Sequence, residues 1–247
     1  MKYLIAFILS LSMAHAIITV VPVEVGDNPG FSGKLSGSLE TKRGNTDKDE
    51  YNAGLRLQYD NNESYVLWSD IIGSYGEVDG VKNTNKTYAH VRYIHDLYKE
   101  NYTWETFFQS ATNEFTKVDR KRLYGGGVRY NTSHTEYGEI FLGFGGFYET
   151  IEYTTFIDPH ENNVRINSYL AYTKELGDKS KVAYVAYYQP NTKDFTDHII
   201  SNAIELYINI YEKFYLSFVF YYDIDSKPAI GVEKEDITQK TSFIYEF

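Results

Sequence analysis

The sequence predicts an all-β protein: a single closed antiparallel transmembrane β-barrel of about 12 strands, connected as an up-and-down meander. Three observations predict this fold. From Phe31 onward apolar and polar residues alternate with a period of two, and no helical period is sustained. The chain ends with Phe243, Tyr245 and Phe247 on one strand face. It contains 25 Tyr and 15 Phe residues at a mean hydropathy of −0.43, which suits strands that place every second residue in lipid.

Residues 1–16 predict a signal peptide. A charged start precedes the apolar run Leu4–Met13, and an Ala-His-Ala sequence then supplies the small residues that signal peptidase reads. The apolar run is too short to cross a bilayer as a helix, which needs about 20 residues. We therefore expect an exported protein, with a periplasmic lead-in over residues 17–30 and the barrel over residues 31–247.

The composition excludes several classes of protein. The chain contains no cysteine, so disulfides, thiol chemistry and cysteine metal ligands are excluded. Its formal net charge is −10, and no cluster of Lys and Arg occurs. Since phosphate binding needs a basic surface, no nucleic-acid partner is expected.

Alternation and turn residues divide the chain into twelve expected strands. Gly, Asn, Asp and Pro, which favour turns, separate the alternating runs. The expected strands are Phe31–Thr41, Tyr51–Tyr59, Ser64–Tyr75, Thr87–Tyr98, Tyr102–Thr112, Lys121–Tyr130, Tyr137–Glu149, Val164–Thr173, Lys181–Gln189, Ile199–Ile210, Phe214–Asp223 and Lys240–Phe247.

One face of most expected strands is nearly free of charge, and the other face carries the charge. A Lys or Arg at the bilayer midplane costs roughly 2–4 kcal/mol, so the uncharged face is expected to meet lipid. In chain order, the outward sets begin with Phe31, Leu35 and Leu39, then Ala53, Leu55 and Leu57, then Ala89, Val91 and Tyr93, then Tyr102, Trp104 and Phe108, then Tyr124 and Val128, then Ile140, Leu142 and Phe144, then Val164, Ile166 and Leu170, then Ile204, Leu206 and Ile208, then Phe214, Leu216, Phe218 and Phe220.

Two expected strands and one glycine run depart from this pattern. In the third strand Trp68 and Ile72 share a face with Asp70, so alternation does not decide which face meets lipid. The facing of the ninth strand, Lys181–Gln189, is also undecided. The Gly125–Gly127 run would weaken a flat strand, and we expect it to permit sharp curvature of a barrel wall.

The connections predict the orientation of the barrel. Those after even-numbered strands are expected to be short, and most of those after odd-numbered strands long and polar, such as Glu77–Lys86, Ile151–Asn163 and Asp225–Asp236. Short periplasmic turns and long external loops are typical of outer-membrane barrels.

The terminal strand, Lys240–Phe247, predicts how the barrel closes. An aromatic strand face at the exposed edge of a soluble sheet invites aggregation, whereas in a membrane barrel the last strand pairs with the first and this face meets lipid. An ordinary amphipathic strand in a soluble sheet is the alternative. Phe243, Tyr245 and Phe247 resemble the C-terminal signal that the barrel assembly machinery recognises, and the resemblance implies that machinery as a partner.

The opening of the expected barrel resembles a known family. The stretch Asn28–Gly37, followed by Thr-Lys-Arg-Gly-Asn-Thr-Asp over Thr41–Asp47, is similar to the start of the YdiY-like family of salt-induced outer membrane proteins. The resemblance extends from Gly30 to Phe247. It implies an integral barrel in the outer membrane of a Gram-negative bacterium, in contact with membrane lipids and lipopolysaccharide. It implies no catalytic residues.

Charged and polar residues on the opposite strand faces are the candidate lumen lining: Arg56, His90, Arg92, Asp96, Glu105, Arg129, Glu139, Arg165 and Glu205. Both signs of charge are present, as expected of a pore that sorts small solutes or ions. The alternative is an ion-pair network that fills the interior of a structural or osmotic stress-response barrel. Twelve strands enclose more space than eight and less than sixteen, so the strand number leaves both hypotheses open.

The sequence predicts neither an enzyme nor a cofactor. Nucleophile-elbow and His-Glu-x-x-His motifs are missing, and the His residues are not spaced as metal ligands. Since some outer-membrane hydrolases and acyltransferases are barrels, lipid modification through His90 stays a weaker hypothesis, as does acid–base chemistry by Asp96 and Glu105. His95 lies on the opposite strand face from His90, and we expect it at the membrane interface.

Overall fold

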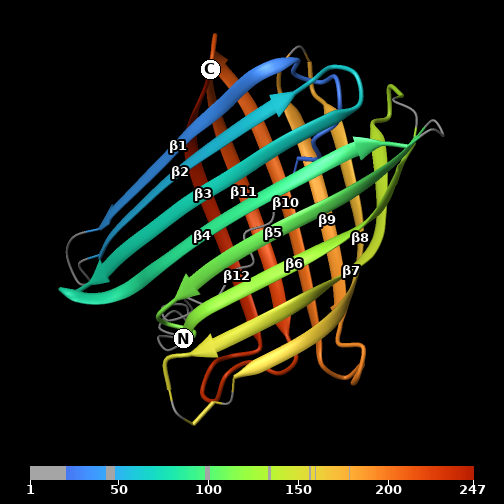
Figure 1. Ribbon diagram of the computed structural model, residues 1–247. Coiled ribbons are helices and arrows are strands. Elements are labelled where there is room, and N and C mark those ends of the chain that lie inside the picture. Colours follow the sequence, from blue (N-terminus) through green and yellow to red (C-terminus); the bar gives the residue numbers. More distant parts are fainter. Residues whose placement is uncertain are drawn as a thin grey trace, which may run out of the picture.

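The computed structural model is a closed barrel of 12 antiparallel strands (Figure 1). It describes residues 21–42, 48–97, 101–132, 135–155, 157–158, 160–177 and 179–247, without the side chains of residues 39–42 and 48. The expected signal peptide, residues 17–20 of the expected lead-in and residues 43–47 of the family-like opening lie outside this part of the chain.

Each strand pairs with its sequence neighbours, and β1 pairs with β12, so the prediction of a closed up-and-down meander is confirmed. The strands are β1 (Gly30–Lys42), β2 (Lys48–Asp60), β3 (Tyr65–Val78), β4 (Val81–Asp96), β5 (Tyr102–Asn113), β6 (Val118–Asn131), β7 (Glu139–Tyr153), β8 (Glu161–Glu175), β9 (Lys181–Pro190), β10 (His198–Tyr211), β11 (Phe214–Asp225) and β12 (Glu235–Glu246). The described residues include no helix long and apolar enough to cross a membrane.

The connections lie alternately at the two ends of the barrel. We call the end with Phe247 and the β2–β3 connection the terminal end, and the end with the β11–β12 connection the loop end (Figure 1). The expected length difference holds only in part. At the loop end, β3 and β4 continue to a tight turn at Asp79 and Gly80, whose φ angles are 51° and 74°, whereas the terminal-end connection over residues 132–138 is longer.

The prediction of a long polar loop over Glu77–Lys86 was therefore wrong. Its polar residues belong to the ends of β3 and β4, where Glu77 pairs with Lys82 and Gly76 with Thr84. A polar run resembles a loop in sequence, but a barrel strand keeps its polar residues where one face borders a polar interior. The Asp-Gly pair has the left-handed backbone that a two-residue hairpin requires.

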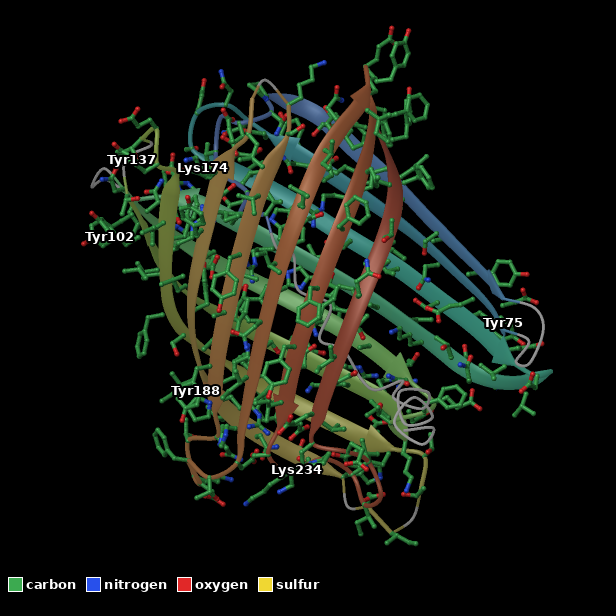
Figure 2. All side chains as sticks on the ribbon, turned by 180° about the vertical axis from the view of Figure 1, so that it is seen from behind. Tyr75, Tyr102, Tyr137, Lys174, Tyr188 and Lys234 are labelled. Atoms are coloured by element: carbon green, nitrogen blue, oxygen red, sulfur yellow. The ribbon has the colours of Figure 1, made fainter. Side chains whose placement is uncertain are left out.

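Outward-facing side chains form an apolar surface around the barrel, and Phe144 is 68% exposed there. Figure 2 shows Tyr102 and Tyr137 toward the terminal end, and Tyr75 and Tyr188 toward the loop end. Exposed aromatic residues near both ends of an apolar belt are typical of membrane barrels.

The structure decides the facing of the two undecided strands. In β3, Val66, Trp68 and Asp70 are buried and therefore point inward. In β9, Ala183 and Val185 are buried, while Tyr184 and Tyr188 are exposed on the outside. The inward face of the barrel thus contains apolar as well as charged side chains.

The seam between β1 and β12 closes the barrel near its terminal end. Residues Lys34–Gly37 pair with Phe243–Glu246, and Gly33 and Phe247 exchange two backbone hydrogen bonds of 3.0 Å. Beyond this register the two strands diverge toward the loop end (Figures 1 and 2). β12 begins earlier than expected, at Glu235.

Candidate functional site in the barrel lumen

A stack of aromatic and cationic side chains crosses the middle of the lumen. Trp68 is 2% exposed, with the His90 ring stacked on it at a centroid distance of 4.8 Å. The Arg56 guanidinium lies 4.7 Å from the Trp68 centroid and that of Arg92 lies 5.7 Å from it. The stack forms because Trp68 and Arg92 are cross-strand partners on the inward face, and contacts of this kind stabilise a desolvated cation.

The arginines of this stack are paired with carboxylates on neighbouring strands. Arg56 donates from Nε and Nη2 to the two oxygens of Asp70 at 2.7 and 2.6 Å. The Nη1 of Arg92 lies 3.6 Å from an oxygen of Glu105, and Glu105 also accepts a hydrogen bond of 3.1 Å from Tyr169. Since a bidentate arginine–carboxylate pair holds both groups in one geometry, the middle of the lumen is rigid and has no large excess of either charge.

A second ion cluster lies nearer the loop end. Glu149 is 0% exposed and accepts from Arg165 Nε at 2.7 Å and pairs with Lys121 Nζ at 2.8 Å. Arg165 also pairs with Asp197 at 2.9 Å. These charges are desolvated, so each depends on its partners to remain ionised.

The loop end of the lumen contains a cavity of about 170 Å³. Its floor is formed by Trp68, Arg92 and Tyr187, and the β11–β12 connection contributes Ala229 and Lys234 to its mouth. Figure 2 shows Lys234 at this end. The cavity can hold several water molecules or a small polar solute.

Hydrogen bonds between connections fasten the β11–β12 connection at this mouth. Ile230 donates from its backbone N–H to Asp158 at 2.9 Å, and its carbonyl accepts from Lys117. Lys227 donates to Asp194 at 2.6 Å. Three other connections at the loop end thus restrain one connection across the cavity.

At the terminal end, residues 21–26 lie inside the barrel, and we call them the plug segment. Val21 packs against an inward apolar cluster of Phe141, Ala171, Ala183, Val185, Ala203 and Val219. Val23 and Val25 pack against Val66, Trp68 and Ile94. Apolar residues on a water-filled wall would be unfavourable, whereas here the plug segment covers them.

Polar contacts fix the plug segment to the wall. Arg129 donates from Nη1 to the Val23 carbonyl at 3.0 Å, and Asn131 donates from Nδ2 to Glu24 at 2.8 Å. The Gly26 N–H donates to Asp60 at 2.8 Å. Backbone groups that leave water are satisfied in this way by side chains of β2 and β6.

Burial changes the acidity of the plug segment. The pKa of Glu24 is raised to about 7. Burial is the main cause, and the nearby Glu139 carboxylate also raises the pKa, whereas the Arg129 guanidinium lowers it. Burial, together with the Glu24 charge, raises the pKa of Asp27 to about 6. Each carboxyl therefore takes up a proton more readily in the docked segment than in water.

A smaller space of about 20 Å³ adjoins the plug segment. Trp68, Arg92 and Tyr187 line both this space and the larger cavity, so these three side chains form the boundary between the two. We call them the central layer. The lumen thus has, in order, a cavity, a central layer and a plug segment.

The structure places the sequence-predicted lumen residues on the inward face and distributes them along the whole lumen. Arg56, His90, Arg92 and Glu105 gather at the central stack, Arg129 and Glu139 at the plug segment, and Arg165 toward the loop end. Glu205 accepts a hydrogen bond of 2.5 Å from Ser217. Asp96 is exposed because it is the last residue of β4. Their role in sorting solutes stays a prediction.

The sequence reasoning missed the apolar and aromatic part of the lumen. Phe141 is fully buried on the inward face of β7, and Tyr169 and Tyr187 are inward on β8 and β9. A signal was available: in β7, Phe141 shares strand parity with the inward Glu139 and Glu149. This shared parity was not used, because only polar side chains were expected in the lumen.

The residues considered for catalysis lie in different environments. His90 is enclosed by rings, and its Nδ1 pairs with the Tyr88 hydroxyl at 3.1 Å. His95 lies on the outer face, stacked on Trp104 at 5.8 Å. Asp96 is opposite Thr103 in the β4–β5 register, and Glu105 is opposite Ile94. A catalytic role for these residues stays an untested hypothesis.

The terminal aromatics lie on the outer face. Phe243, Tyr245 and Phe247 are 67%, 37% and 41% exposed. The ring of Phe247 lies over Gly33, where a Cβ atom would come within 2.5 Å of it. Recognition of this strand by assembly machinery stays a prediction.

Comparison with known proteins identifies the family. A family described as "Protein of unknown function, DUF481" matches residues 36–247. The chain belongs to this family. The resemblance to YdiY-like proteins is thereby confirmed. No curated protein matches the chain.

Solved structures are similar to the chain in fold alone. The translocator domain of autotransporter NalP from Neisseria meningitidis has a TM-score of 0.49 at 10% identity, covering 90% of each chain. KdgM porin has a TM-score of 0.45 at 11% identity, covering 87% of this chain and 96% of the porin. The transport unit of the autotransporter AIDA-I from Escherichia coli has a TM-score of 0.39 at 11% identity, covering 90% of this chain and 91% of that unit.

Proposed function

We propose that the protein spans the outer membrane and that its lumen is a pathway for small solutes or ions, closed here by the plug segment. One observation carries this proposal: a segment that precedes β1, and is not part of the barrel wall, lies at the terminal end of the lumen and is held there by non-covalent contacts. The wall behind it includes the small residues Ala171, Ala183 and Ala203. Withdrawal of the segment would therefore leave space at the terminal end, as far as the central layer of Trp68, Arg92 and Tyr187.

The outer surface supports the membrane location. A closed barrel satisfies its backbone groups within the sheet, which a membrane requires, and this barrel is covered by exposed apolar side chains. We propose that membrane lipids and lipopolysaccharide contact this surface. We also propose that the barrel assembly machinery binds the strand ending in Phe243, Tyr245 and Phe247.

Planar-bilayer recording tests the pathway. The wild-type protein is expected to give rare or short openings, and deletion of residues 21–26 is expected to give stable conductance steps. Glu63→Gln, at an exposed position in the β2–β3 turn, serves as a control and should behave as the wild type. A silent bilayer for the deletion protein, with the barrel shown to be folded, would contradict the proposal.

Selectivity provides a second readout. In the deletion protein, Arg92→Gln removes a positive charge from the central layer and should shift the reversal potential toward cation selectivity. Arg120→Gln, at an exposed position at the loop end, should shift it less. Equal shifts would place the selective charge outside the central layer.

A structural or osmotic stress-response barrel is the second candidate. The paired buried charges of Arg165, Glu149 and Asp197 favour it, because a network that satisfies itself also fills space. This candidate is supported if the deletion protein stays silent and loss of the protein lowers cell survival after an osmotic shift.

A further inference from the structure

One amide group connects the plug segment to the barrel wall through two carboxylates. Asn131 Nδ2 donates to Glu24 Oε2 at 2.8 Å and to Glu139 Oε1 at 3.2 Å. Glu24 belongs to the plug segment, and Glu139 is the buried first residue of β7. Because both oxygens accept from the same nitrogen, the two carboxyl groups lie close together.

The surroundings leave this pair with more negative than positive charge. Arg129 on β6 is the nearest cation, and its Nη1 is engaged by the Val23 carbonyl. Other charged groups around the docked segment include Asp27 in the lead-in, Asp60 on β2, Arg92 and Asp96 on β4, and Lys181 on β9. Two like charges in a buried site cannot both ionise without a large cost, so a proton on Glu24 beside the Glu139 carboxylate is the favourable state.

We propose that Glu24 and Glu139 form a proton-binding pair in which Glu24 carries the proton and holds the plug segment in the lumen, and that loss of this proton releases the segment. The proposal rests on the proposed function, because it describes how the same lumen is opened.

The direction of the pH effect follows from the carboxyl group of Glu24. Its pKa is about 7 when docked and returns toward the ordinary 4.5 when the segment is released. A group whose pKa is raised in one state favours that state at low pH. Docking is therefore strongest below the ordinary carboxyl pKa and weakens as the pH rises through 7. Asp27, with a pKa of about 6, acts in the same direction.

The equilibrium between docked and released segment should thus change measurably between pH 5 and pH 8. Since one unit of pKa difference corresponds to a tenfold change in an equilibrium, we expect docking to weaken by about tenfold or more over this range. The Glu24→Gln variant, which keeps the hydrogen bonds of a protonated carboxyl, should remove the part of this dependence that Glu24 contributes and leave the part that Asp27 contributes.

Thiol labelling measures docking without reference to conductance. The chain has no cysteine, so Val23→Cys introduces a single reporter at a buried position. Its rate of labelling by a water-soluble maleimide is divided by that of Glu63→Cys, an exposed site, which corrects for the pH dependence of the thiol. We expect the ratio to rise by about tenfold or more from pH 5 to pH 8, and to rise less when Glu24→Gln is added, by the part that Asp27 contributes. Glu136→Gln, an exposed control at the same end, should leave the rise intact.

The outcomes of these experiments test the proton-binding pair independently of the proposed solute pathway. An unchanged labelling ratio, or the same rise with Glu24→Gln, overturns the proton-binding pair even where deletion of residues 21–26 opens a conductance. A rise that depends on Glu24, with a bilayer that stays silent, supports the pair and contradicts the pore.

Discussion

Gly33 on β1 lies directly beneath the aromatic ring of the C-terminal residue, Phe247. A Cβ atom there would lie 2.5 Å from the Phe247 ring and 2.8 Å from the Arg56 carbonyl oxygen. Real carbon contacts are longer, so any larger residue displaces the ring or the backbone. The close packing of the short β1–β12 seam thus requires glycine, which has no side chain, at position 33.

Gly33→Ala should lower the free energy of unfolding by about 1–3 kcal/mol, because it overpacks this seam. Gly37→Ala is the matched control on the same strand, since its Cβ would meet its nearest atom at 3.9 Å. Urea unfolding of the protein in lipid vesicles measures both. Equal effects would show that packing of Phe247 does not hold the seam.

Arg165 holds two buried carboxylates, Glu149 and Asp197. Arg165→Met leaves them with fewer partners and should lower the free energy of unfolding by about 3 kcal/mol. Lys227→Met breaks the exposed pair with Asp194 and should lower the free energy of unfolding much less, because solvent screens an exposed ion pair. Comparable losses in the same unfolding experiment would indicate that the Arg165 cluster is hydrated.

At the scale of the element, the position of an outward-facing residue along its strand decides how much a charged substitution destabilises the barrel. Phe218 lies in the middle of the outward face of β11, and Phe214 lies at its first residue. Phe218→Arg should destabilise the barrel by about 2–4 kcal/mol, and Phe214→Arg by about 0–1 kcal/mol. Unfolding from lipid vesicles distinguishes them. If both arginines are tolerated equally, this face does not meet hydrocarbon.

Element boundaries were harder to predict than element faces. The charged faces of β4 and β5 were assigned by alternation alone, because a period of two is a local property of the chain. The hairpin at Asp79 and Gly80 was missed, because polar residues such as Lys82 and Thr84 occur both in loops and in strands bordering a polar lumen. Only pairing with β3 shows that they are in a strand.

At the scale of the whole molecule, the lumen is organised by contacts between distant residues. Val21 meets Ala171 and Ala203, and Arg129 meets Val23. No local pattern in the chain predicts these contacts, and the sequence reasoning placed residues 17–30 outside the barrel wall without an interior partner. The closed order of strands brings residues of six different strands to the small space beside the plug segment.

The sequence by itself determined the all-β class, the twelve strands and the facing of most of them, because alternation, turn residues and a terminal aromatic strand act over a few neighbouring residues. It also predicted which charged residues face the lumen. Tertiary structure alone decided the inward stack on Trp68, the buried Phe141 and the docking of residues 21–26. The physical reason is that an inward side chain packs against, or forms hydrogen bonds with, residues on the other side of the lumen. Which residues these are is decided only when the strands close into a barrel.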